Sequence, residues 1–293
     1  MKILATQKYV FVFYASILTR YDGETLQEQW TTPLCYGMYR KMFYLEDEES
    51  LIVSATGGFI LKYDMTTLER QWVKYIKEYS IIHWLERISS HAFVMADRYT
   101  VTVFSVATGD ILTLYRTLTG MNWTCMTSLG HNQWVTSCRN RPLHHWKYDT
   151  TISVVNEVKE VQTLPKDVLI YHPSVHKIIA FDVGNMEVYD CRTWTCIFTY
   201  EHDQPIGRRT LVPGTWIEAF MTEGDIILTN GNRIIKTEPG EAFSFLPSGN
   251  KMIVYDQGIL RKVDIYQRDR MMSLLHGQSH FPSVMWRMVR QKI

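Results

Sequence analysis

The chain has 293 residues, of which 46% are hydrophobic and 13% aromatic, and its formal net charge is +1. A chain of this length can bury a large core, and 31 basic against 30 acidic side chains give it no global attraction to nucleic acid. The abundant aromatic residues favour strands over helices.

The first apolar stretch, Tyr9–Leu18, is predicted to be a strand and not a secretory signal. Lys8 lies directly before it, and no small-x-small cleavage site follows it. No apolar run approaches the roughly 18 residues of a membrane span. We therefore expect an intracellular protein, cytoplasmic or nuclear, without a membrane span.

From this strand onward one pattern returns about every forty residues. A short apolar stretch leads into a turn, a second stretch often ends in an aromatic–acid pair, and a third stretch follows. Repeats of this period, built from short strands, are typical of propellers and solenoids. The seven copies are Tyr9–Trp30, Leu51–Trp72, Ala92–Tyr115, Gln133–Val158, Lys177–Tyr200, Trp216–Thr237 and Lys251–Leu275.

A fourth strand is expected ahead of most copies. Mixed apolar and small residues suit a strand that lines a central channel, and four strands make a propeller blade. The candidates are Lys41–Leu45, Ser80–Leu85, Trp123–Leu129, Asp167–His172, Arg209–Pro213 and Glu241–Leu246.

The sequence thus predicts an all-β fold: a single seven-bladed β-propeller of four-stranded antiparallel blades spanning residues 1–293. The expected blades are 1–37, 38–78, 79–120, 121–165, 166–205, 206–240 and 241–293.

The two ends of the chain decide how such a ring closes. The first copy lacks an obvious inner strand, whereas Ser283–Val289 is a spare strand-like segment. We expect this C-terminal segment to complete the first blade, since closure removes exposed sheet edges. The alternative is that Lys2–Thr6 supplies the outermost strand of the last blade.

The repeats resemble the WD-repeat β-propeller superfamily. The family ends its third strand with Trp-Asp, and the equivalent pairs here are Tyr21-Asp22, Tyr63-Asp64, Tyr148-Asp149 and Tyr189-Asp190. Thr108-Gly109 also fits the family, as do the turn aspartates Asp97, Asp182 and Asp256. Gly130-His131 lies before a second strand instead of opening its repeat, so the family's His–Asp network is in doubt. Phe59–Trp72 is also similar to the quinoprotein-type repeat, which Trp30 fits as well.

No strong catalytic, cofactor or metal site is found, and none is predicted. The pairs His172/His176 and His276/His280 have helical i, i+4 spacing in a strand context. His144 and His145 would point to opposite faces of a strand, with at least one on the surface. The acidic run Glu46–Glu49 is interpreted as a solvated hairpin loop. Asp97, Asp182 and Asp256 are interpreted as turn residues that bond their own backbone.

Tyrosine and arginine gather at the positions expected on one rim, where second strands turn into third strands and blades are linked. Both residue types are enriched in binding hot spots. The candidate partner-binding residues are Tyr36, Tyr39, Arg40, Tyr79, Arg98, Tyr99, Arg139, Arg141, Arg208 and Arg209.

These observations, with the resemblance, indicate a non-catalytic interaction scaffold that is a subunit of a larger complex of proteins. One alternative is a propeller enzyme or small-ligand binder that uses the central channel. Another is a nucleic-acid-associated subunit, since the segment Arg261–Ile293 carries seven basic and two acidic residues. The five cysteines, odd in number and without CxxC spacing, are typical of reduced thiols in an intracellular protein.

Overall fold

The computed structural model describes residues 1–14, 16–33, 39–76, 84–96, 100–116, 123–138, 141–161, 168–172, 176–182, 185–201, 209–212, 215, 217–221, 224–230 and 233–265. Every helix or strand that it assigns in these ranges is a β-strand. The described residues contain no helix that is long and apolar enough to cross a membrane.

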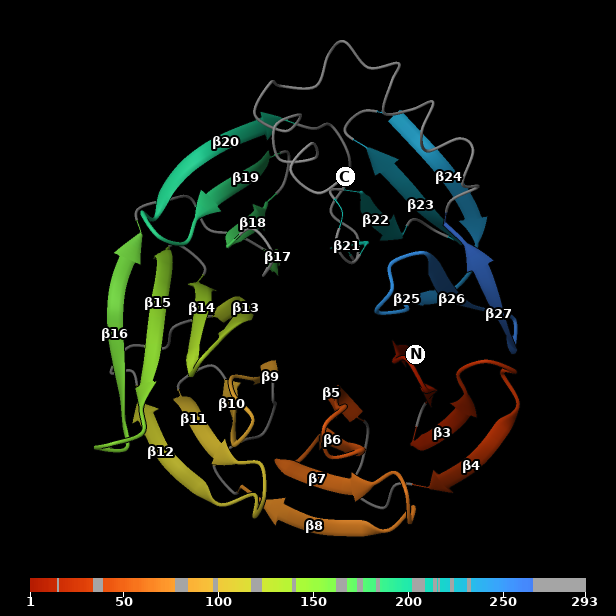
Figure 1. Ribbon diagram of the computed structural model, residues 1–293, viewed down its shortest axis with the longest axis horizontal. Helices are drawn as coiled ribbons and strands as arrows, with labels where there is room; N and C mark the ends of the chain where they lie inside the picture. Colours follow the sequence, from red (N-terminus) through yellow and green to blue (C-terminus); the bar gives the residue numbers. More distant parts are fainter. Residues whose placement is uncertain are drawn as a thin grey trace.

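The strands form seven antiparallel sheets arranged in a ring (Figure 1). Blade 1 contains β1 (Lys2–Ala5), β2 (Tyr9–Tyr14), β3 (Ile17–Asp22) and β4 (Glu28–Pro33). Blade 2 contains β5 (Tyr39–Leu45), β6 (Ser50–Ala55), β7 (Phe59–Asp64) and β8 (Arg70–Tyr75). Blade 3 contains β9 (Trp84–Arg87), β10 (Ala92–Ala96), β11 (Thr100–Ser105) and β12 (Ile111–Arg116).

The second half of the chain repeats this order. Blade 4 contains β13 (Trp123–Gly130), β14 (Gln133–Cys138), β15 (Arg141–Asp149) and β16 (Val154–Val161). Blade 5 contains β17 (Val168–His172), β18 (Lys177–Phe181), β19 (Asn185–Asp190) and β20 (Thr195–Glu201). Blade 6 contains β21 (Arg209–Leu211), β22 (Glu218–Met221), β23 (Asp225–Asn230) and β24 (Arg233–Pro239). Blade 7 has three strands within the described residues: β25 (Ala242–Phe245), β26 (Lys251–Asp256) and β27 (Ile259–Asp264).

Each blade runs in chain order from the channel to the perimeter, as Figure 1 shows. The second strands are almost continuously buried, as in β6 and β10, because neighbouring blades cover both faces of each sheet. The residues of fourth strands such as β12 are exposed or half-buried. The structure confirms the seven-bladed all-β propeller, and the six expected inner strands correspond to β5, β9, β13, β17, β21 and β25.

Ring closure differs from both expectations. β1 pairs with β2 and is the inner strand of blade 1, so the place foreseen for Ser283–Val289 is already filled. The same pairing excludes Lys2–Thr6 as the outer strand of the last blade. Ser283–Val289 itself lies outside the described residues. Blades 1 and 7 meet through an apolar cluster, which includes Ile3 and Ile253, and through the bond from Ala5 N to Ser244 Oγ (3.0 Å).

The fourth strand of each of the first six blades carries a β-bulge at the same place. The register to the third strand shifts by one residue there, which leaves one residue of the fourth strand without a partner opposite. Bulges bend a strand and make its free edge a poor template for another chain. The bulged residues are Gln29, Gln71, Leu112, Val158, Ile197 and Ile235.

Candidate partner-binding rim

The antiparallel order gives the ring two different rims. Inner strands begin, and second strands turn into third strands, on what we call the start rim. First-to-second and third-to-fourth turns lie on what we call the opposite rim. Inner strands of adjacent blades contact one another, as in the hydrogen bond from Tyr171 N in β17 to Thr127 Oγ1 in β13 (3.3 Å).

Four of the ten residues predicted to bind partners have described backbone positions. Tyr39 and Arg40 begin β5, Arg141 begins β15 and Arg209 begins β21, so the topology brings all four to the start rim. Their role in binding stays a prediction. The other six, Tyr36, Tyr79, Arg98, Tyr99, Arg139 and Arg208, lie outside the described residues.

A polar cluster that the sequence analysis missed lies on the inner strands β5 and β9. Lys41 follows Arg40 in β5, and its Nζ lies 4.0 Å from the centroid of the Trp84 ring in β9. A lysine at this distance from an indole face makes a cation–π contact. Glu86 is two residues beyond Trp84 on the same inner strand and so on the same face. The signal in the sequence was a basic residue near the start of one inner strand and an aromatic residue at the start of the next.

The Glu86 carboxyl is a weaker acid than an ordinary glutamate. Burial raises the pKa of Glu86 to about 7, and the positive charge of Lys41 offsets only part of that rise. The carboxyl therefore exchanges its proton near neutral pH. Raised carboxyl pKa values of this kind occur in functional sites and in structural pairs.

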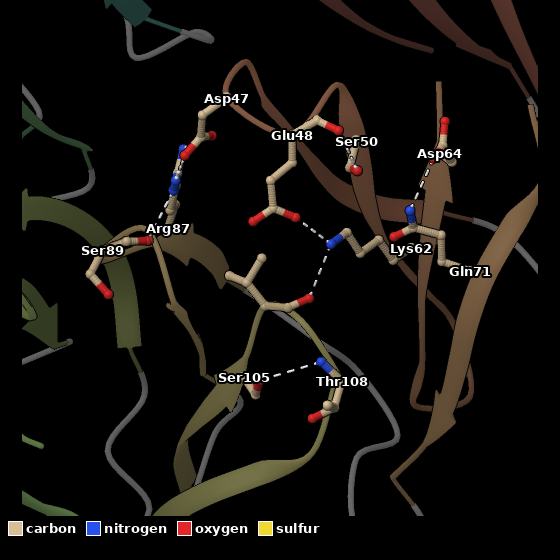
Figure 2. Close-up of polar contacts among 11 residues, drawn as sticks. Asp47, Glu48, Ser50, Lys62, Asp64, Gln71, Arg87, Ser89, Ser105 and Thr108 are labelled. Atoms are coloured by element: carbon tan, nitrogen blue, oxygen red, sulfur yellow. Dashed lines mark hydrogen bonds and ion pairs between the residues drawn. The ribbon is translucent and has the colours of Figure 1, made fainter. Parts of the chain in front are cut away.

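Charges on the opposite rim serve to join blades (Figure 2). The hairpin Glu46–Glu49 connects β5 to β6, and three of its four carboxylates form ion pairs. Asp47 accepts two hydrogen bonds from Arg87 of blade 3, and Glu49 pairs with Lys8 of blade 1 at 2.7 Å. The loop is a solvated hairpin, as expected, with Glu46, Asp47 and Glu48 exposed. The sequence analysis missed that its carboxylates also pair with blades on either side.

Lys62 adds a further link on this rim. It is a buried lysine of β7 whose Nζ lies 2.5 Å from Glu48 Oε2 and donates to the carbonyl oxygen of Val106 in blade 3 at 3.3 Å (Figure 2). A buried ammonium is tolerated only when it is paired in this way.

The aspartates of the Tyr-Asp pairs close the third-to-fourth turns. Asp22 Oδ1 accepts from the backbone N–H of Glu24 and Thr25, and Asp64 Oδ1 accepts from Thr66 and Thr67. These hydrogen bonds lower the pKa of both carboxyls. Their chemistry is therefore that of turn formation.

The structure tests the predicted turn role differently for each of the three aspartates that the family resemblance places in turns. Asp182 accepts from the backbone of Asn185 at 3.1 Å, which confirms the predicted turn role. Asp256 ends β26, and its backbone bonding stays a prediction. Asp97 lies outside the described residues.

His144 and His145 point to opposite faces of β15, as expected, but the prediction of a surface histidine is wrong. Both are buried, with 4% and 6% of their surface exposed, because β15 is covered by blades 3 and 5. His144 Nδ1 lies 2.5 Å from Glu157 Oε1. His145 Nε2 lies 2.8 Å from Gln133 Oε1, and its ring packs against Trp194 of blade 5 at 4.6 Å.

The other histidine pairs form no metal centre among the residues described. His172 ends β17, whereas the Nδ1 of His176 lies 2.9 Å from the hydroxyl of Tyr171. His276 and His280 are outside the described ranges. Within those ranges no three histidine, cysteine, aspartate or glutamate side chains gather where they could hold a metal ion.

Comparison with known proteins shows the fold. No family model and no curated protein matches the sequence. Among solved structures, the chain is similar to a chain of the "Crystal Structure of Mitotic Checkpoint Complex", with a TM-score of 0.70 and 10% identity over 91% of this chain and 87% of that one. The expected seven-bladed β-propeller is thereby confirmed as a fold, and the resemblance to the WD-repeat superfamily stays a prediction.

Proposed function

We propose that this chain is a non-catalytic protein-interaction scaffold, a subunit of a larger complex, that binds its partners through the start rim. The observation that carries the proposal is the difference between the two rims. On the opposite rim the carboxylates of Asp47, Glu48 and Glu49 are engaged with basic side chains. The start rim collects tyrosine and arginine positions from several blades.

The contacts between blades support the rigid presentation that a scaffold needs. Blades 1, 2 and 3 are joined by Lys8–Glu49 and Arg87–Asp47, and blades 6 and 7 by Arg261–Glu238 at 2.8 Å. Blade 7 is joined to blade 1 by Lys262, which lies 3.3 Å from Glu24. A preorganised surface binds at a lower entropic cost than a mobile one.

The similar solved chain belongs to a multiprotein complex, which supports a role in an assembly for this chain as well. Cys191 and Cys196 are free thiols, in keeping with the intracellular, cytoplasmic or nuclear location that forms part of the proposal.

Affinity purification with mass spectrometry tests the proposal. The wild-type chain is compared with an Arg98→Glu/Tyr99→Ala variant and with Lys147→Glu, which changes an exposed residue near the opposite rim. The start-rim variant should lose partners that the Lys147 variant keeps, with both variants folded by circular dichroism. An identical set of partners for all three proteins would contradict the proposal.

A further inference from the structure

The hairpin that connects β15 to β16 in blade 4 is longer than its counterparts. Four residue pairs separate its bulge at Val158 from its tip, the last being Asp149–Val154, whereas the other bulged blades have one or two. The turn between the two strands reaches outward past β12 at the edge of the ring (Figure 1, lower left). β16 is the outermost strand of its sheet, so this hairpin lies on the perimeter of the propeller.

Three aliphatic side chains of the blade 4 hairpin face water. Ile152 in the turn is 64% exposed, Val154 at the start of β16 is 41% exposed and Val158 at the bulge is 52% exposed. The turn has a defined structure, because Asp149 Oδ1 accepts hydrogen bonds from the backbone N–H of Thr151 (2.9 Å) and from its hydroxyl group. Exposed apolar side chains that gather on an ordered element mark an interaction site.

The corresponding turns of other blades pack their apolar residue against a neighbour. Four positions after the turn aspartate, the residue has a positive φ, and it is Leu26 in blade 1 and Trp194 in blade 5. Leu26 packs against the cluster between blades 7 and 1, and Trp194 against the cluster between blades 4 and 5. Blade 4 has Ser153 at this position, with φ +53°. The polar Ser153 cannot anchor its turn in the same way, and Ile152 beside it stays exposed.

The perimeter of blades 1 and 2 is polar where that of blade 4 is apolar. At the bulge these two blades carry Gln29 and Gln71, whose amides donate to the turn aspartates of their own blades (3.3 and 3.2 Å). Blade 4 carries Val158 at the bulge, and its neighbours, blades 3 and 5, carry the exposed Leu112 and Ile197. Aliphatic side chains therefore replace hydrogen-bonded amides on this side of the ring.

We propose that the blade 4 hairpin binds the same hairpin of a second copy of this chain, with the two β16 strands antiparallel. The charges favour this arrangement. Asp149 is the charged residue of the turn 149–153, whereas Lys159 follows Val158 at the other end of the apolar segment. The Nζ of Lys159 donates to an uncharged group, the carbonyl oxygen of Thr193, at 3.5 Å. Antiparallel copies bring each Asp149 toward the Lys159 of the other copy, whereas parallel copies would oppose like charges.

The exposed side chains also define where the two copies meet. Ile152 and Val158 are equally far from Val155 along the chain, so an antiparallel contact that covers both is centred near Val155. Ile152 of one copy then lies against Val158 of the other. The bulge at Val158 interrupts the free edge of β16, so we expect side-chain contacts and not a sheet that continues from one copy to the next.

The proposed contact is small and does not involve the start rim. Three aliphatic side chains from each copy form a limited apolar area. The dimer should therefore be weak, with a Kd on the order of micromolar. Partners of the proposed function could bind the start rim of either copy.

Sedimentation velocity of the full-length chain, from micromolar to hundred-micromolar concentrations, tests the proposal. The wild type should shift reversibly from monomer to dimer. Ile152→Ser and Lys159→Glu should each weaken the dimer about tenfold or more, and Lys159→Arg should keep it. The control is Ile259→Ser, which removes an isoleucine of similar exposure (66%) from blade 7 and should leave the dimer unchanged. Circular dichroism checks that each variant is folded.

Disulfide crosslinking tests the antiparallel arrangement. The background is Cys196→Ser, which removes an exposed thiol. Under mild oxidation, a mixture of Ile152→Cys and Val158→Cys proteins should form a crosslinked dimer, because these positions meet across the contact. Ile152→Cys alone should not, because its two copies lie at opposite ends of the contact.

Three results would overturn the proposal: a chain that stays monomeric at every concentration, equal effects of Ile152→Ser and Ile259→Ser, or crosslinking of Ile152→Cys to itself in preference to Val158→Cys. A monomeric chain whose captured partners depend on Ile152 would replace the second copy with another protein. Failure of the dimer would leave the proposed function standing, because the Arg98→Glu/Tyr99→Ala variant tests the start rim separately.

Discussion

Arg87 of blade 3 holds Asp47 of blade 2 through two parallel hydrogen bonds, of 2.8 Å from Nη1 and 2.6 Å from Nη2. The guanidinium fork matches the carboxylate, which makes such a pair stronger than a single contact. The two residues are 40 positions apart in the chain. Their pairing joins the inner strand of blade 3 to the first hairpin of blade 2. The acidic hairpin thus acts as a joint between blades.

Asp47→Asn should lower the free energy of unfolding by about 0.5–1 kcal/mol at pH 7, because both partners are partly exposed. The Arg87 guanidinium lowers the pKa of Asp47, so this stabilisation is present above the ordinary value of 3.8 and is lost as the pH falls through the lowered value. Denaturant melts at pH 7 and pH 2.5 check this sign. Glu46→Gln in the same hairpin is the control, and an equal loss for both variants would contradict the role of the pair.

We predict that the contact between blades 4 and 5 at His145 weakens at acidic pH. Burial lowers the pKa of His145 from 6.5 to about 4, so between these values the unfolded chain binds a proton that the folded chain does not. Stability is complete above about pH 6.5 and falls as the pH drops toward 4. His145→Gln should flatten this part of the stability profile, whereas the exposed His91→Gln should not. Thermal melts from pH 4 to 7 measure the difference; parallel profiles for the wild type and His145→Gln would refute it.

Local signals in the sequence predicted much of the fold. The Tyr-Asp pairs located the ends of the third strands because each aspartate bonds the turn that follows it, as Asp22 and Asp64 show. Alternating apolar residues located the strands. The segment Lys2–Thr6 was considered as a strand, but it was assigned to the outer edge of the last blade and not to the inner strand β1 of blade 1, because its pairing with β2 has no local signal.

Contacts between blades could not be predicted in the same way. The partners of Asp47 and Glu49 are 40 and 41 residues away, and no local pattern pairs them. The adjacent His144 and His145 look like surface residues until blades 3 and 5 cover the two faces of β15. The Lys41–Trp84 contact arises only when two inner strands line the same channel. These contacts therefore depend on tertiary packing, and composition and local pattern do not predict them.

Gly109 shows how closely one blade approaches the next. It has φ +70°, and an added Cβ would lie 2.9 Å from the Trp72 ring of blade 2. Gly130 has a similar φ of +75° with no atom within 4 Å of the same position. Gly130→Ala should therefore cost about 1 kcal/mol of left-handed strain, and Gly109→Ala about 2–4 kcal/mol because the clash with Trp72 adds to it. Equal losses in urea melts would show that the Trp72 contact is unimportant.

The raised pKa of Glu86 also has a consequence for stability that requires no partner. Glu86 titrates at 4.5 in the unfolded chain and at about 7 in the folded one, so between these values the folded state binds the extra proton. Its favourable contribution is complete below about pH 4.5 and is lost as the pH rises through 7. Glu86→Gln keeps the shape of the side chain without its charge, and should raise the free energy of unfolding by about 1–3 kcal/mol at pH 8. At pH 4.5 the two proteins should be equally stable. Denaturant melts at pH 8 and pH 4.5 measure the difference. A Gln variant that is less stable than the wild type at pH 8 would contradict the prediction. It would show that Lys41 stabilises ionised Glu86 by more than burial destabilises it.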